Sequence, residues 1–259
     1  MSFSDIPAFR MFGNLYFVGC KKVSVHIIKT EAGLVMIDTG YPDMFEIITE
    51  GMKELGLDPK NIIAIFHSHG HIDHFGCTLR LKALSGAKTY IGAPDNDIVN
   101  GKDNLSWTEE LGLEDFEKFN CDVLIRDGDE FTFGKTTVRC LHTPGHTEGV
   151  MSYFVNVEEN GESLIAGMFG GAGMNSLSAD WLNKKGLSFS CRDKFRASLN
   201  KARREKVDIV MGNHTSHNET AKKRETILSG GRIADKEEWG RMLQMFEKRL
   251  DDMLLKESE

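Results

Sequence analysis

The chain has 259 residues, of which 40% are hydrophobic and 27% are charged, and its formal net charge is −7 at pH 7. This length fits one α/β domain, the negative charge argues against nucleic-acid binding, and no apolar run is long enough to span a bilayer. The five cysteines form no C-x-x-C pair and the N-terminus has no basic start before an apolar core, so we expect a cytoplasmic protein with reduced thiols.

The first 65 residues are predicted to form strands and one helix. Three short apolar segments predict a meander of strands, namely Leu15–Val18, Val23–Ile28 and Leu34–Ile37. Asp43 is the expected N-cap of a helix whose apolar residues recur at helical spacing as far as Gly56. The apolar run 62–65 then predicts a buried strand that ends at a loop.

That loop holds four imidazoles and one carboxylate within the eight residues His67–His74, in an H-x-H-x-D-H pattern. Imidazole nitrogen and carboxylate oxygen suit zinc and other first-row divalent ions. Side chains at the carboxyl end of a strand can converge on one point, and burying so many titratable groups without partners would be costly. The loop is therefore predicted to bind metal.

Beyond the loop, leucines at helical spacing predict a helix that ends at Gly86, followed by a strand at 89–91. The alternation of strands and helices indicates a layered α/β architecture. Residues 95–120 have no clear place in it and are treated as an inserted loop or lid. Two readings stay open, a surface excursion packed on the domain or one wall of a substrate pocket.

A second half rich in strands follows, with expected strands at 123–125, 130–133, 137–141, 151–157, 163–166 and 207–211. A basic segment near residues 192–206 either forms a charged face exposed to solvent or attracts an anionic substrate. A helix is expected at about 219–228, and residues 236–258 form an appended C-terminal helix. The apolar face of that last helix either docks on its own domain or forms a homodimer contact.

Several motifs resemble those of the metallo-β-lactamase-fold hydrolases. The histidine loop is similar to the signature loop of that family, with His67, His69, Asp73 and His74 as the matching residues. The segments 37–40 and 143–149 resemble its early strand-end motif and its T-P-G-H-T-x-G motif. The resemblance implies a single metallo-hydrolase domain over residues 1–259, folded as an αββα sandwich with an additional C-terminal helix.

The family's metal ligands can be carried over by position. By resemblance, one ion is held by His67, His69 and His146, and a second by Asp73, His74 and His214. Two Zn²⁺ ions per chain are therefore expected, although other first-row divalent metals fit such ligands, and no other cofactor is expected.

The same resemblance gives Asp73 a second role and bears on three further residues. Asp73 would also orient the attacking hydroxide as a catalytic residue, and Asp38 would orient a ligand histidine. His71 falls at a variable position of the motif and is expected to point elsewhere. His217 competes with His214 for the last ligand position, and we prefer His214 because it directly follows a strand.

Met168 stands where many members carry an aspartate that bridges both metals, which resembles the third subclass of metallo-β-lactamases. The serines that bind the drug's carboxylate in those enzymes have no match in Phe169–Gly173. The resemblance implies a zinc-dependent, β-lactamase-like hydrolase that uses metal-bound hydroxide on an amide or ester carbonyl of a small molecule. The alternatives are a lactonase or other cyclic ester or thioester hydrolase, a phosphodiesterase, and a non-catalytic metal-binding protein.

Overall fold

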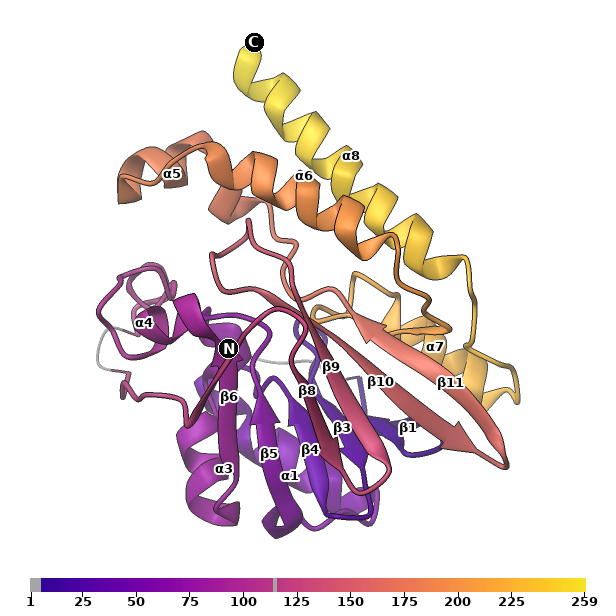
Figure 1. The fold of residues 1–259 in the computed structure, drawn as a ribbon. Coiled ribbons are helices and arrows are strands. Elements are labelled where there is room, and N and C mark those ends of the chain that lie inside the picture. Colours follow the sequence, from indigo (N-terminus) through magenta and orange to yellow (C-terminus); the bar gives the residue numbers. More distant parts are fainter. Residues whose placement is uncertain (1–5, 114–115) are drawn as a thin grey trace.

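The computed structural model describes residues 6–113 and 116–259, and its strands form two facing sheets (Figure 1). The first sheet has seven strands, which lie side by side in the order of the chain. Neighbouring strands are antiparallel from β1 to β4 and parallel from β4 to β7. They are β1 (Phe9–Phe12), β2 (Leu15–Phe17), β3 (His26–Lys29), β4 (Leu34–Ile37), β5 (Ile62–Phe66), β6 (Lys88–Gly92) and β7 (Val123–Ile125).

The second sheet has five strands in the order β12-β11-β10-β9-β8. Only β11 and β12 are parallel, and the other neighbours are antiparallel. The strands are β8 (Glu130–Phe133), β9 (Thr136–His142), β10 (Met151–Glu159), β11 (Glu162–Met168) and β12 (Ile209–Val210).

Helices cover the outer face of each sheet (Figure 1). The first sheet is covered by α1 (Phe45–Glu54) and α3 (Thr78–Ser85), and the second by α5 (Ala179–Lys185), α6 (Ser190–Ala202) and α8 (Glu238–Ser258). The remaining helices are α2 (Ile72–Phe75), α4 (Asn96–Val99), α7 (Thr220–Leu228), and the 3₁₀ turns η1 (Pro42–Met44), η2 (Pro59–Asn61), η3 (Ala93–Asp95), η4 (Glu109–Leu111) and η5 (Asn175–Leu177).

The residues of β4 show why the layers form. Val35 and Ile37 face the core between the two sheets, while Leu34 and Met36 face the core under α1 and α3. Successive side chains of a strand point to opposite faces, so a strand with no polar residue must be buried on both sides. The prediction of an αββα sandwich with a C-terminal helix is confirmed.

Three local predictions differ from the structure. The sequence analysis missed β1, which is short and lies at the sheet edge. Val23 was expected in a strand but makes only an isolated bridge, with His214. Asp43 was expected to cap α1, but it lies inside the turn η1, and Met44 occupies the N-cap position without a side-chain hydrogen bond.

The apolar face of α8 is covered by its own domain. Trp239, Leu243 and Phe246 are buried among residues of α6, β10 and β12. The indole Nε1 of Trp239 also donates to the carbonyl of Ala202 at 2.9 Å. This contact corresponds to the docking alternative, and a homodimer contact through the helix stays a prediction.

Within residues 6–113 and 116–259, no helix combines the length and apolar character needed to cross a bilayer. All five cysteines are buried and free of disulfides, which agrees with the expected reduced thiols. The expected cytoplasmic location stays a prediction.

Candidate metal centre

Three segments that are far apart in the sequence bring six side chains together. His69 and His71 lie in the loop after β5, and Asp73 and His74 lie in the short helix α2 that follows. His146 lies in the loop between β9 and β10, and His214 follows β12. The side chains form two groups of three, one consisting of His69, His71 and His146, the other of Asp73, His74 and His214.

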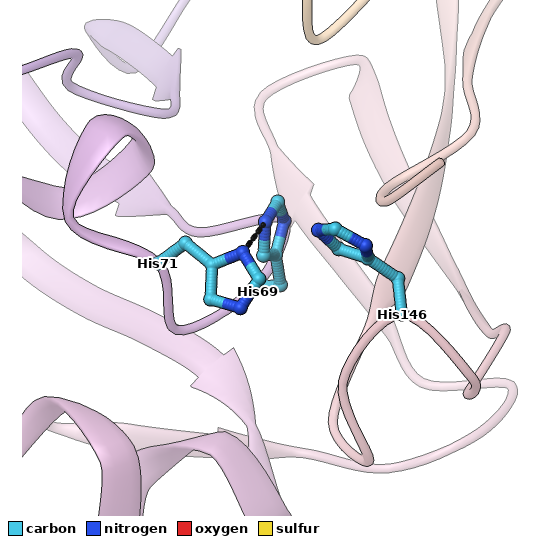
Figure 2. Close-up of side chains that lie close together, drawn as sticks. All are labelled: His69, His71 and His146. Carbon is cyan, nitrogen blue, oxygen red and sulfur yellow. Dashed lines mark hydrogen bonds between the residues drawn. The ribbon is translucent and has the colours of Figure 1, made fainter. Parts of the chain in front are cut away.

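The first group consists of three buried imidazoles whose ring nitrogens converge (Figure 2). The ring centroids of His69 and His71 lie 4.6 Å apart, and each lies 4.6 or 4.7 Å from that of His146. The Nε2 atom of His69 is 3.1 Å from the Nδ1 atom of His71. Nitrogens in such positions can serve as ligands of one small cation.

The second group combines one carboxylate with two imidazoles. Asp73 Oδ2 lies 3.4 Å from Nε2 of His74 and 3.6 Å from Nε2 of His214. The rings of His69 and His74 are 4.2 Å apart, so the two groups adjoin. One oxygen and two nitrogen ligands suit zinc or another first-row divalent ion.

Hydrogen bonds on the far side of two rings of the first group fix which nitrogen carries the proton. Nδ1 of His69 lies 2.9 Å from the carbonyl oxygen of Gly170, and Nδ1 of His146 lies 2.8 Å from that of Gly173. A carbonyl only accepts, so each Nδ1 carries the hydrogen, and Nε2 of each ring presents a lone pair to the group.

Asp38 orients His74 in the same way. Its Oδ2 accepts from Nδ1 of His74 at 2.8 Å, and its Oδ1 accepts from the backbone N–H of Ser68 at 2.7 Å. Asp38 has φ of 60°, a left-handed conformation that is sparsely populated for residues other than glycine. The Nε2 atom of His74 is buried and has no hydrogen-bond partner among the described residues, which fits an atom that awaits a cation.

The electrostatics of the first group favour neutral imidazoles. Burial lowers the pKa of His69 and His71 well below the usual value and that of His146 to about 4. Metals bind neutral imidazole, so these residues are in the ligand form at neutral pH.

The second group is electrostatically different. Burial by itself lowers the pKa of His74, but the carboxylates of Asp73 and Asp38 outweigh it and raise the pKa. The pKa of His214 is lowered, chiefly by burial. The two groups therefore differ in how readily a proton competes with a metal.

The structure corrects the expected first group, because it brings His71 and not His67 next to His69 and His146. His67 directly follows β5, and its Nε2 lies 3.3 Å from the hydroxyl of Thr78 on α3. The prediction that His71 points elsewhere is wrong. An H-x-H-x-D-H pattern that ends at Asp73 and His74 must begin at His69, and the predicted register started two residues too early.

The other expected residues lie where the sequence placed them. His146, Asp73, His74 and His214 all belong to the two groups. His217 lies outside them, with its Nδ1 2.9 Å from Oδ1 of Asn213.

Asp95, which the sequence analysis missed, connects the two histidine loops. Its Oδ2 accepts from the backbone N–H of Gly70 at 2.8 Å and from the hydroxyl of Thr147 at 2.5 Å. Its Oδ1 accepts from the backbone N–H of Gly149 at 2.6 Å. Gly70 separates His69 from His71 and Thr147 follows His146, so this buried carboxylate holds the loops of the first group together.

A cavity of about 270 Å³ opens in front of the two groups. The insertion supplies Trp107 and Leu111 to its wall, next to His71 and His214. Of the two readings of residues 95–120, the structure therefore supports the pocket wall. A cavity of this size next to ligand side chains can admit a small molecule.

The chain belongs to the metallo-beta-lactamase superfamily, whose family model matches residues 18–159, more than half of its length. It is also similar to the crystal structure of BJP-1, a subclass B3 metallo-beta-lactamase of Bradyrhizobium japonicum, with a TM-score of 0.88 and 25% identity. That match covers 99% of this chain and 96% of the other. The predicted resemblance to the third subclass is confirmed.

Two curated relatives match shorter stretches. A beta-lactamase hydrolase-like protein of Agrobacterium fabrum is 39% identical over 112 residues, 42% of this chain and 24% of that protein. An N-acyl homoserine lactonase of a Bacillus species is 26% identical over 165 residues, 54% of this chain and 60% of the lactonase. The chain thus spans less than two thirds of the length of either relative.

The glycines after β11 give a prediction for this centre. A Cβ at Gly171 would lie 2.8 Å from Cδ2 of His146, closer than real Cβ contacts. Gly171→Ala should therefore displace the His146 ring and lower metal affinity by about 10-fold or more, as loss of ligand orientation does. A metal titration measures the affinity of the variant.

Gly240→Ala in α8 is the control, because a Cβ there meets nothing within 4 Å and an alanine in the helix should stabilise the protein by about 0.5–1 kcal/mol. Equal metal affinity in both variants would contradict the contact between Gly171 and His146.

Proposed function

We propose that the protein is a β-lactamase-like hydrolase that needs two Zn²⁺ ions per chain and cleaves a small-molecule amide or ester. The observation that carries the proposal is the pair of adjoining groups of three side chains, in which the buried Nε2 of His74 has no hydrogen-bond partner among the described residues. Three protein ligands per ion leave coordination positions for water and substrate, as in catalytic rather than structural zinc sites.

Each group has its own part in this proposal. His69, His71 and His146 would hold one ion, and Asp73, His74 and His214 the other. Ions bound in this way lower the pKa of a bound water and polarise a carbonyl. Asp73 would both bind metal and accept a proton from the attacking water, because its carboxylate is partly exposed to the cavity.

Other residues keep the ligands in place. Asp38 holds the proton of His74 on Nδ1, and the carbonyls of Gly170 and Gly173 do the same for His69 and His146. Trp107 and Leu111 line one side of the cavity. A substrate in the cavity would thus lie between this apolar wall and the side chains that would bind metal.

Phosphodiester hydrolysis loses its main support in the structure. The basic segment had been considered as an attraction for an anionic substrate, but most of its cations are paired with carboxylates. The pairs are Arg192 with Glu257, Lys194 with Glu148, Arg196 with Asp251, Lys201 with Asp127 and Arg203 with Glu247. A segment neutralised in this way offers little net field to an anion.

A lactone or thioester is the second candidate substrate. Side chains at Gly171 and Gly173 would collide with the ring of His146, so this stretch has no hydroxyl with which to bind a substrate carboxylate. The match to an N-acyl homoserine lactonase is a second reason to consider a cyclic ester as the substrate. An uncharged cyclic ester or a thioester needs no such hydroxyl.

A hydrolysis panel on metal-quantified protein tests the proposal. β-Lactams, lactones, thioesters and a phosphodiester are assayed while zinc is raised from zero to excess. We expect turnover of at least one carbonyl substrate to rise with occupancy up to about two ions per chain and to vanish with a chelator. Two bound ions without turnover of any substrate would indicate a metal-binding protein, and saturation near one ion would reject the second site.

A further inference from the structure

A second, smaller cavity adjoins the first group of histidines on the side of α5 and α6. Its volume is about 130 Å³, and His71 and His146 line both this cavity and the larger one in front of the ligands. A molecule that reacts at the histidines can therefore reach into either space. We call the smaller one the side cavity.

The wall of the side cavity is mainly apolar. Trp181 and Leu182 of α5 are buried in it, and Leu187 between α5 and α6 lies at its edge. Burial raises the pKa of the Cys191 thiol, so this side chain stays neutral and behaves as a small apolar group.

The polar groups around the side cavity contact one another or the histidines. The hydroxyl of Ser176 lies 2.7 Å from Nδ1 of His146, and the hydroxyls of Ser188 and Ser190 are bonded to each other at 2.9 Å. At the rim, Lys194 pairs with Glu148 at 2.8 Å. The side cavity therefore presents no net charge and only hydroxyls as hydrogen-bonding groups of its wall besides the two histidines, so a charged occupant would lose hydration without compensation.

Two stacked indoles separate the side cavity from the larger one. The rings of Trp107 and Trp181 lie 4.0 Å apart with an angle of 7° between their planes. Trp107 lines the larger cavity and Trp181 the side cavity. Trp107 has φ of 65°, a conformation that costs energy for a non-glycine residue and is held here by packing. The stacked pair thus forms a partition between the two cavities.

We propose that the side cavity is a substrate subsite for a neutral, apolar group about the size of a benzene ring, attached to the acyl side of the scissile carbonyl. A dry cavity of about 150 Å³ lined by apolar side chains can hold benzene, and the side cavity is of that order. The inference rests on the proposed hydrolase function and narrows its substrate class to acyl compounds with an aromatic or compact branched group.

A matched pair of thioesters tests the subsite, an acetyl and a phenylacetyl thioester with the same leaving group. Leu187→Trp should fill the side cavity and lower kcat/KM for the phenylacetyl substrate by about 10-fold or more, while changing that for the acetyl substrate by less than about 3-fold. Leu228→Trp is the control, because Leu228 is 67% exposed at the end of α7 and lines neither cavity. Cys191→Leu is a second filling variant if Leu187→Trp fails to fold.

Binding without turnover gives an independent readout. The ¹⁹F signal of 4-fluorobenzyl alcohol should broaden with the parent protein and with Leu228→Trp, and stay sharp with the filled variants. If the probe binds but no thioester, lactone or lactam is cleaved, the hydrolase proposal fails, the substrate role of the side cavity fails with it, and only its binding of a neutral apolar group is supported. A different result would refute the subsite while the hydrolase proposal stands. In that result carbonyl substrates are cleaved, the cavity-filling variants slow hydrolysis of both thioesters equally or of neither, and the ¹⁹F signal of 4-fluorobenzyl alcohol stays sharp with every protein.

Discussion

His71→Ala should abolish hydrolysis and weaken metal binding by more than about 100-fold, whereas His67→Ala should leave two ions bound per chain. Changing a residue that merely orients a metal ligand costs about 10- to 100-fold in affinity, so removing a ligand should cost more. Nδ1 of His71 lies 3.1 Å from Nε2 of His69, and its ring lies 4.6 Å from that of His146, while His67 contacts Thr78 on α3. Metal analysis after dialysis, together with kcat/KM, measures both variants.

The comparison is not confounded by damage to α2. His71 occupies the N-cap position of that helix, but its side chain makes no capping hydrogen bond, so alanine removes none. His67 is fully buried, and the folded fraction of His67→Ala is therefore checked by near-UV circular dichroism before its metal content is compared. If folded His67→Ala loses an ion and His71→Ala keeps both, the assignment of the first group is wrong.

Much of the fold could be predicted because each element carries its own signal. β4 and β5 are continuous apolar runs, and α3 ends at Gly86, whose φ of 73° lies in the left-handed region that glycine adopts readily. The family motifs then implied which loops meet at the sheet edges. Such signals are local, so these elements can be predicted without knowledge of the tertiary packing.

The error at His67 and His71 has a physical cause. The chain leaves the regular geometry of β5 at His67, and the alternation of strand side chains no longer tells which of the closely spaced imidazoles face inward. Their composition alone predicted a metal loop. The direction of each ring depends on contacts with α3, on the other histidine loop and on Asp95.

Asp95 lacked any sequence signal strong enough to single it out. It is one acidic residue in a short turn after β6, and its partners lie 25 to 54 residues away in the chain. The contact between Trp107 and Trp181 could not be predicted either, because Trp181 belongs to the helix α5, which the sequence analysis did not predict. Features built from distant contacts appear only when the chain is folded.

Acidification should remove the two ions one after the other, with the ion on Asp73, His74 and His214 leaving first. A metal ion competes with protons for its ligands, so binding weakens once the pH falls below the pKa of a ligand in the metal-free protein. The carboxylates of Asp73 and Asp38 raise the pKa of His74 above 6.5, whereas burial lowers that of His146 to about 4. Proton competition therefore begins at a higher pH in the second group than in the first, where it begins only near pH 4.

Metal analysis of protein equilibrated at fixed free zinc between pH 8 and pH 4 tests this order. We expect occupancy to fall from about two ions to about one at a pH well above 4, and activity to fall with it if both ions are required. His214→Ala should remove the upper step because it removes a ligand of the second group, and His217→Ala should keep both steps because that ring lies outside both groups. Loss of both ions in one step near pH 4 would mean that the carboxylates beside His74 do not favour its protonated form. An upper step lost in His217→Ala and kept in His214→Ala would instead transfer the last ligand position to His217.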